Sequence, residues 1–250
     1  MHEGVVRSNP TSGAALPARD EHKRIEDGTD DLADDHEVHA LTSDQLAALL
    51  LVVAASHRLL VQLLAATGLR ISEAVALRWG DLTLDGSRPA VKVRRAYVRG
   101  HFKAPKSKYG RRTVPIDFEL VRALRKARPA DVDERALVFP GPQGAPLHAS
   151  NQLVRVLKPA MQEIGAPWAG FHTLRHTCAS RLFAAGRNPV QVSRWLGHHS
   201  PAFTLSTYAH LMNDDLGEPL ALPAAGVSES ASGTDGYDPH QPVAELAKVA

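Results

Sequence analysis

The spacing of hydrophobic residues is the feature that most limits how this chain can fold. The spacing is helical along most of residues 41–212, and it changes to a period of two only between Gly80 and about Ile116. Helical spacing predicts amphipathic helices, and a period of two predicts half-buried strands. The sequence therefore predicts an α+β domain that is mainly α-helical and contains a small antiparallel β-sheet.

Several of the expected helices have clear boundary signals. Thr42 and Gln45 form a capping-box pattern at the start of the first helix, and Gly68 ends the second. Later boundaries carry glycine, Asn-Pro or Ser-Pro signals, at Gly186, Asn188-Pro189, Gly197 and Ser200-Pro201. The segments AVKVRRAYV and RRTVPI are predicted strands, and RGHFKAPKSKYG between them is a predicted mobile loop.

The two ends of the chain differ in charge from the part between them. The chain has a net charge of +2, yet residues 1–40 hold ten acids and four bases, and residues 213–250 hold seven acids and one base. Both ends lack a hydrophobic period, so we expect a disordered acidic tail or linker at 1–40 and an acidic, mostly disordered tail at 213–250. Residues 41–212 hold 24 bases and 10 acids. This excess indicates either a surface that binds polyanions or a solvated basic face.

Composition also indicates a compartment. The longest apolar run, 46–55, has ten residues, whereas roughly 20 are needed to cross a bilayer. The first residues contain no apolar stretch typical of a secretory signal. Cys178 is the single cysteine and cannot form an internal disulfide. We therefore expect a cytoplasmic protein without a membrane span.

Candidate functional residues have ordinary structural explanations when each is considered alone. Arg70 and Glu73 are spaced as an ion pair on one helical face. His172 and Cys178 lie in a helix with an apolar stripe, and both can be core residues. Tyr208 can be a core aromatic whose hydroxyl is hydrogen-bonded.

A zinc site is a further alternative. His172 and His176 are four residues apart, and His198 and His199 are adjacent. Neither a His-Glu-x-x-His motif nor a cysteine pair accompanies them, so we expect no metal ligand and no cofactor.

Considered together, the candidates match one reaction, the attack of a phenol on a DNA phosphodiester. The reaction needs a nucleophile, positive charge around the phosphate and a proton donor for the departing sugar oxygen. Tyr208 is the candidate nucleophile, and Arg70 and Arg175 can hold the phosphate with their planar guanidinium groups. Three further groups complete the hypothesis: His172 as proton acceptor for the phenol, His198 as hydrogen-bond donor to the phosphate and Lys106 as proton donor to the 5′ oxygen.

These residues occur within TGLRISEAVALRW, PKSKYGRRTVPI, FHTLRHTCASRL and WLGHHSPAFTLSTYAHL. In this order and spacing the four segments resemble the tyrosine recombinase, or phage integrase, family, and the resemblance covers roughly residues 41–212. It implies that 41–212 is a catalytic domain that cleaves and rejoins DNA strands at specific sites through a 3′-phosphotyrosine. It also implies double-stranded DNA as partner, a homo-oligomer in the form of a synaptic tetramer, and no metal or ATP.

The resemblance assigns roles to individual residues. Arg70 and Arg175 match the two catalytic arginines, Glu73 the supporting acid, and His172 the first residue of the His-x-x-Arg motif. Lys106 matches the lysine of the β-hairpin, with Lys108 as a fallback, and His198 matches the second histidine in preference to His199. Tyr208 matches the nucleophile. Further basic residues near the hairpin are predicted DNA contacts, namely Lys103, Lys108, Arg111 and Arg112.

The sequence departs from the family pattern before residue 41. Family members usually carry a helical core-binding domain there, and the acidic residues 1–40 cannot form a complete one. We therefore expect weaker discrimination between sites. Two alternatives remain open: a type IB topoisomerase, which shares the chemistry, and a DNA-binding remnant or regulator that lacks full recombination activity.

Overall fold

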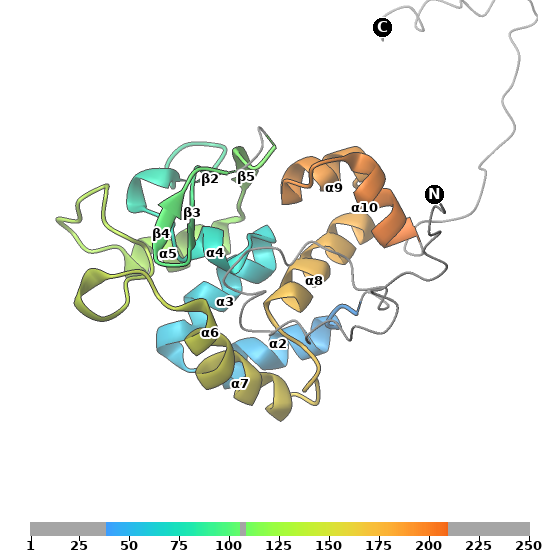
Figure 1. The fold of residues 1–250 in the computed structure, drawn as a ribbon, viewed down its shortest axis with the longest axis horizontal. Coiled ribbons are helices and arrows are strands. Elements are labelled where there is room, and N and C mark those ends of the chain that lie inside the picture. Colours follow the sequence, from blue (N-terminus) through green and yellow to red (C-terminus); the bar gives the residue numbers. More distant parts are fainter. Residues whose placement is uncertain (1–38, 106–108, 210–250) are drawn as a thin grey trace, which may run out of the picture. The chain divides into compact units, whose positions relative to one another are not determined.

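The structure is a computed structural model, and it describes residues 39–105 and 109–209 (Figure 1). Nearly all of the two predicted acidic tails lies outside these ranges, so their disorder remains a prediction. Lys106 and Lys108 also lie outside the described residues.

The described chain is mainly helical, with five short strands in its first half. The first half contains α2 (Ser43–Val52), α3 (Ala55–Thr67), α4 (Ile71–Ala74), η1 (Trp79–Asp81), β1 (Leu82–Thr83), β2 (Ala90–Val93), β3 (Ala96–Val98), β4 (His101–Lys103), β5 (Arg112–Pro115) and α5 (Phe118–Ala127). The second half contains η2 (Pro142–Gly144), α6 (Ala149–Gln152), the π-helical turn η3 (Leu153–Leu157), α7 (Lys158–Glu163), α8 (Phe171–Ala184), α9 (Pro189–Leu196) and α10 (Pro201–Tyr208).

The predicted signals at the first two helices are confirmed. The side chain of Thr42 accepts a hydrogen bond from the backbone N–H of Gln45, and the Gln45 side chain accepts one from the backbone N–H of Thr42. Gly68 ends α3 in a left-handed conformation with φ of 63°, which a residue without a Cβ adopts readily. The predicted shared helical face of Arg70 and Glu73 is wrong, because Arg70 is the extended residue that precedes the four-residue α4.

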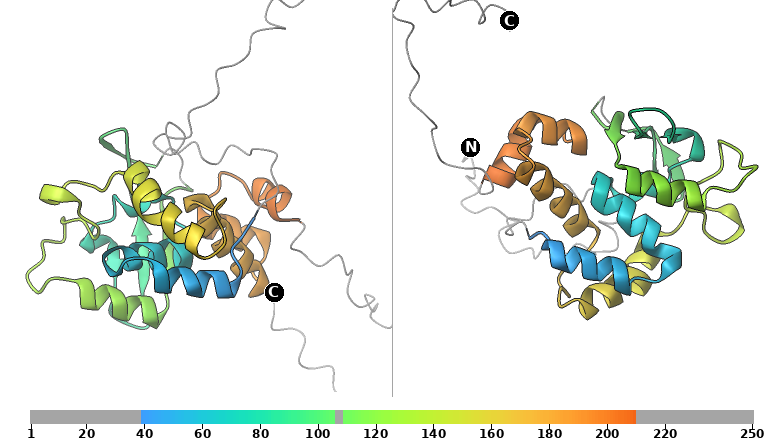
Figure 2. Two further views of the ribbon diagram at one scale, coloured as in Figure 1. Left: turned by 90° about the horizontal axis from the view of Figure 1, so that it is seen from below. Right: turned by 180° about the vertical axis from the view of Figure 1, so that it is seen from behind.

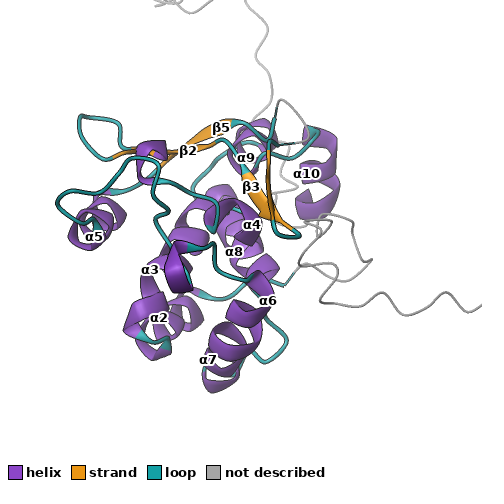
Figure 3. Ribbon diagram, turned by 60° about the vertical axis from the view of Figure 1, so that its left-hand side comes forward, coloured by secondary structure: helices purple, strands orange, loops and turns teal. Residues whose placement is uncertain are grey.

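The strands form two small antiparallel sheets (Figure 3). One sheet has the order β1-β2-β5, with Val91 opposite Val114; both valines are fully buried, as the predicted period of two requires. The predicted strand AVKVRRAYV is divided after Val93, and its second part pairs with residues 101–103 as the β3–β4 hairpin. The beginning of the predicted loop is therefore a strand.

Helices from distant parts of the sequence pack together (Figures 1 and 2). The helix α3 packs against α8, and α9 packs against α8, α10 and β5. The large apolar core extends from α2 through the three-stranded sheet to the start of α8. A smaller core contains residues of α8 and α9 together with Tyr208, the last residue of α10.

The helices of the described residues are too short or too polar to cross a membrane.

Candidate active site

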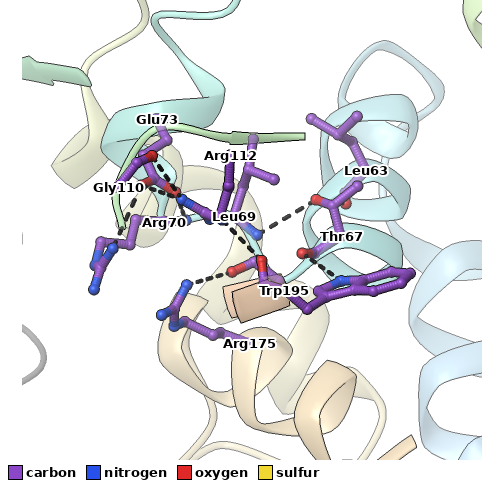
Figure 4. Close-up of polar contacts among 10 residues, drawn as sticks. Leu63, Thr67, Leu69, Arg70, Glu73, Gly110, Arg112, Arg175 and Trp195 are labelled. Atoms are coloured by element: carbon purple, nitrogen blue, oxygen red, sulfur yellow. Dashed lines mark hydrogen bonds and ion pairs between the residues drawn. The ribbon is translucent and has the colours of Figure 1, made fainter. Parts of the chain in front are cut away.

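Glu73 and Arg112 form a buried ion pair at the start of α4 (Figure 4). Each Glu73 carboxylate oxygen accepts a hydrogen bond of 2.9 Å from one terminal nitrogen of Arg112. Glu73 also accepts a 2.9 Å hydrogen bond from the backbone N–H of Arg70 and one of 3.4 Å from its guanidinium Nη1. Burial acts to raise the pKa of Glu73, but Arg112 and Arg70 outweigh burial and hold that pKa at about 2. Glu73 is therefore ionised and fixes the position of Arg70.

The guanidinium of Arg112 joins three elements. Besides its pair with Glu73 on α4, its Nε donates to the backbone oxygen of Trp195 on α9 at 2.8 Å, while its own backbone belongs to β5. Gly197 makes room for it, since a Cβ there would lie 2.8 Å from Arg112 Nη1. The side chain is only 6% exposed. The prediction that Arg112 contacts DNA does not agree with this placement, because its charged head is already bound inside the protein.

Arg175, on α8, reaches the end of α3. Its Nη1 donates a 2.6 Å hydrogen bond to the backbone oxygen of Gly68, while its Nη2 is buried and has no hydrogen-bond partner among the described residues. Burial, reinforced by the charge of Arg112, lowers the pKa of Arg175 to about 10. Burial and Arg175 likewise lower the pKa of Arg70 to about 10. Both groups stay cationic at neutral pH, and two partly desolvated guanidinium groups attract an anion strongly.

Tyr208 lies at the end of α10 with its side chain 1% exposed. It packs in the smaller core, with its ring centroid 5.7 Å from that of Phe183. Its hydroxyl is 2.6 Å from Nδ1 of His176. Burial raises the pKa of the phenol above its ordinary value, although the charge of Arg175 opposes this shift. Tyr208 is thus a core aromatic whose one polar atom is directed at a histidine.

His198 is held in the turn between α9 and α10. Its Nδ1 lies 2.7 Å from the hydroxyl of Thr204, and its ring meets that of Phe203 edge-on. Burial, with the charges of Arg175 and Arg70, lowers its pKa to about 2. The ring is therefore neutral at physiological pH. When Thr204 donates its hydroxyl proton to Nδ1, the ring proton is on Nε2 and can be donated to a ligand.

His172, the predicted proton acceptor for the phenol, lies on α8 beside a second histidine, and its role remains a prediction. Its ring centroid is 5.8 Å from that of His176, and it is His176 that contacts the hydroxyl of Tyr208. From the sequence, His176 was a candidate only as a zinc ligand. A signal was present nevertheless, because positions 172, 175 and 176 share one helical face by their i, i+3, i+4 spacing.

The remaining predicted DNA contacts lie at the protein surface or outside the described part. Lys103, on β4, and Arg111, just before β5, are exposed. Both remain predictions as DNA contacts, as does the role of Lys106 as proton donor.

Two other sequence hypotheses concern metal binding and the cysteine. Within residues 39–105 and 109–209, no group of three His, Cys, Asp or Glu side chains is arranged to hold a metal ion. Burial raises the pKa of the Cys178 thiol to about 12, and its Sγ lies 3.6 Å from the backbone oxygen of Ala66. Cys178 is therefore a protonated packing residue.

Comparison with solved structures defines the class of this fold. The chain is similar to the Tn1549 transposon integrase, solved in complex with transposon right end DNA, with a TM-score of 0.60, 25% identity, and coverage of 71% of this chain and 63% of that one. It also has the fold of the XerA recombinase, with a TM-score of 0.53, 23% identity, and coverage of 72% and 62%. The predicted α+β fold, with a mainly helical catalytic domain and a small antiparallel sheet, is confirmed.

Sequence comparison gives the family. The model of the phage integrase family matches residues 39–214, and the chain belongs to this family. It is 28% identical over 240 residues to a tyrosine recombinase XerC-like protein of Caldanaerobacter subterraneus subsp. tengcongensis, covering 85% of this chain and 58% of that protein. It is 30% identical over 163 residues to tyrosine recombinase XerH of Campylobacter jejuni, covering 64% and 42%. The chain thus spans about half the length of the curated relatives it matches.

Proposed function

We propose that this chain is a site-specific DNA recombinase that cleaves and rejoins strands through a 3′-phosphotyrosine on Tyr208. The observation that carries the proposal is that Arg175 of α8 interacts electrostatically with Arg70, His198 and Tyr208, which come from three other segments. The family match and the relatives named tyrosine recombinase support it. The similarity to the Tn1549 integrase, which was solved with DNA, supports DNA as the substrate.

In the proposed reaction, the arginines neutralise the phosphate on which negative charge accumulates. The buried Nη2 of Arg175 is one donor for a non-bridging oxygen, and Nε2–H of the neutral His198 is another. The oxygen of Tyr208 attacks phosphorus and the 5′ oxygen leaves, taking a proton from Lys106 in the role proposed for that residue. Because the phosphotyrosine ester retains the energy of the broken bond, rejoining needs no ATP.

Strand exchange further requires a second duplex, whose free 5′-OH attacks the phosphotyrosine. We therefore place the reaction in an oligomer of this chain on DNA, with a synaptic tetramer as the expected form. The competing hypothesis is a DNA-binding regulator that occupies such sites without completing the reaction.

Covalent capture tests the function and finds the target site in the same experiment. The full chain is incubated with a library of duplexes that carry a nick just downstream of a randomised segment. Cleavage then releases a short strand that diffuses away, and without its 5′-OH the covalent protein–DNA adduct cannot be reversed. Denatured protein–DNA complexes are collected and their DNA is sequenced. We expect enrichment of a defined site by the wild-type chain and none by Tyr208→Phe. Binding without covalent capture would contradict the recombinase and favour the regulator.

The role of Arg175 is tested on the enriched site. Arg175→Lys keeps the charge but loses the planar pair of donors, so we expect cleavage to fall by about 10²-fold or more, while DNA affinity changes little. A parallel loss of binding and cleavage would contradict a role in the transition state.

A further inference from the structure

The hydroxyl of Tyr208 has a direct partner that the family motif does not assign. We propose that His176 is the catalytic residue that accepts the phenolic proton when Tyr208 attacks DNA. This inference rests on the proposed function, which it deepens by naming the base of the cleavage step. Three observations carry it: the contact between the two side chains, the environments of the other histidines, and the charge around the phenol.

The contact itself is short and fixed by its surroundings. Nδ1 of His176 lies 2.6 Å from the Tyr208 oxygen, within the range in which a proton passes between an acid and a base. The two ring centroids are 5.8 Å apart and tilted by 54°. Tyr208 packs with Ala179 of α8 and Leu196 of α9 in the smaller core. The phenol and the imidazole are therefore oriented by packing before DNA is bound.

The other two histidines near the site are less suited to this role. His198 is bound to Thr204 through Nδ1, and a histidine whose pKa is lowered to about 2 by burial and neighbouring arginines is too weak a base to take a phenolic proton. His172 is located next to His176, at 5.8 Å between ring centroids, on the same helical face. In this arrangement His176 contacts the phenolic hydroxyl directly, whereas His172 contacts the ring of His176.

The charges that face His176 fit a proton transfer coupled to attack. On α8, His172 lies beside it and Arg175 precedes it; Tyr208 faces it from α10, and His198 interacts with it electrostatically from the α9–α10 turn. Arg175 favours the ionised phenol. A phosphate bound beside Arg175 brings negative charge that offsets the repulsion between Arg175 and a proton on His176. The arrangement therefore favours proton transfer when DNA is present.

The proposed step balances in atoms and charge. The lone pair of the Tyr208 oxygen forms the new bond to phosphorus, and the bond from phosphorus to the 5′ oxygen breaks. The phenolic proton passes to Nδ1 of His176, which must carry its own ring proton on Nε2 beforehand. The 5′ oxygen takes a proton from a cationic acid, the role proposed for Lys106. Religation reverses each transfer, so that the imidazolium returns the proton to the phenol.

His176→Asn separates proton acceptance from hydrogen bonding. The asparagine amide oxygen can accept a hydrogen bond near the position of Nδ1, but it cannot take up a proton. We expect cleavage of the enriched site to fall by about 10²-fold or more, with DNA affinity and thermal unfolding close to those of wild type. The exposed His148 provides the matched control, since His148→Asn makes the same chemical change away from Tyr208.

A more acidic phenol provides the decisive readout. Replacing Tyr208 with 3,5-difluorotyrosine by stop-codon suppression makes proton loss easier, so it should raise the cleavage rate of His176→Asn by at least about ten-fold and leave the wild-type rate within a few-fold. Wild-type cleavage by His176→Asn, or a loss that the acidic phenol does not rescue, would overturn the inference while the recombinase function stood. The absence of any Tyr208-dependent adduct in the wild-type chain would instead overturn the proposed function and this inference with it.

Discussion

At the level of single residues, the candidate site depends on the guanidinium of Arg112, which binds groups inside the protein. Arg112 binds both oxygens of Glu73, and Glu73 holds the backbone and side chain of Arg70. A chain of charge-assisted hydrogen bonds thus connects β5 to the residue proposed to bind phosphate. Each of these bonds contributes more than a neutral one, and each is costly to break because its partner is left buried.

Arg112→Lys should expose this dependence. Lysine keeps the charge but cannot bind both carboxylate oxygens and Trp195 at once, so we expect the free energy of unfolding to fall by about 3 kcal/mol. The matched control is Arg122→Lys on α5, where a side chain that is 78% exposed pairs with Glu119; that change should stay within about 0.5 kcal/mol. Urea denaturation followed by tryptophan fluorescence measures both. Equal losses of unfolding free energy in the two variants would contradict the claim that the buried contacts of Arg112 stabilise the fold more than a surface ion pair does.

Glu73 should give stability a specific pH dependence. Its folded pKa of about 2 lies below the ordinary value of 4.5, so the carboxylate stabilises the fold above about pH 5, and this contribution is lost as pH falls from 4.5 toward 2. Glu73→Gln removes it. We expect the wild type to be more stable than the variant by on the order of 3 kcal/mol at pH 7, with the difference shrinking below pH 5. Denaturation curves at pH 7, 5, 4 and 3 test this, and a difference independent of pH would refute it.

At the level of elements, close packing of helices brings the site together. The end of α3 supplies the carbonyl that binds Arg175, and there Gly68 lets α8 and α9 approach. A Cβ on Gly68 would lie 2.5 Å from Leu196 Cδ2 and 3.2 Å from Cys178 Sγ. Gly68 therefore serves twice, as a helix end in a left-handed conformation and as the contact point of three helices.

Gly68→Ala and Gly186→Ala separate these two contributions. Both glycines have positive φ, 63° and 74°, but a Cβ on Gly186 would meet nothing within 4 Å. We expect Gly186→Ala to cost about 1 kcal/mol from backbone strain alone, and Gly68→Ala to cost a further 1–3 kcal/mol or so from overpacking. Chemical denaturation of the two variants measures the difference. Identical losses of unfolding free energy would show that the close packing at Gly68 does not contribute to stability.

At the level of the whole molecule, the distribution of charge is consistent with the proposed binding of DNA. Residues 41–212 carry 24 bases against 10 acids, and both Lys103 on β4 and Arg111 just before β5 are exposed. Binding to phosphates releases the counterions that surround DNA, so affinity that depends on such contacts falls steeply with salt.

The salt dependence of DNA affinity, measured for the wild type and for Lys103→Ala, tests whether these basic residues contact phosphates. If about six to ten phosphates are contacted, affinity for a duplex should fall by roughly 10³–10⁵ between about 50 and 200 mM salt. Removing one phosphate contact with Lys103→Ala should reduce the slope of the log–log plot by about one. Fluorescence anisotropy with a labelled duplex gives both values. An unchanged slope in the variant would contradict the DNA contact at Lys103.

The sequence by itself determined most of the elements and the types of the candidate groups. Local signals are decided by neighbouring residues, which is why the capping box at Thr42 and the helix ends at Gly68 and Gly197 were predicted correctly. The type of each candidate group is also a property of the sequence, so Tyr208 could be selected from it as the candidate nucleophile and Arg175 as a candidate phosphate ligand.

The tertiary structure decided which of these groups meet. The partners of Arg112 come from α4 and α9, 39 and 83 residues away along the chain, and Tyr208 meets a histidine 32 residues before it. No local pattern encodes such distances, because packing of α3, α8, α9 and α10 sets them. The sequence pattern therefore predicted Arg112 on DNA and His172 beside Tyr208, whereas packing buries Arg112 against Glu73 and brings His176 to the phenol.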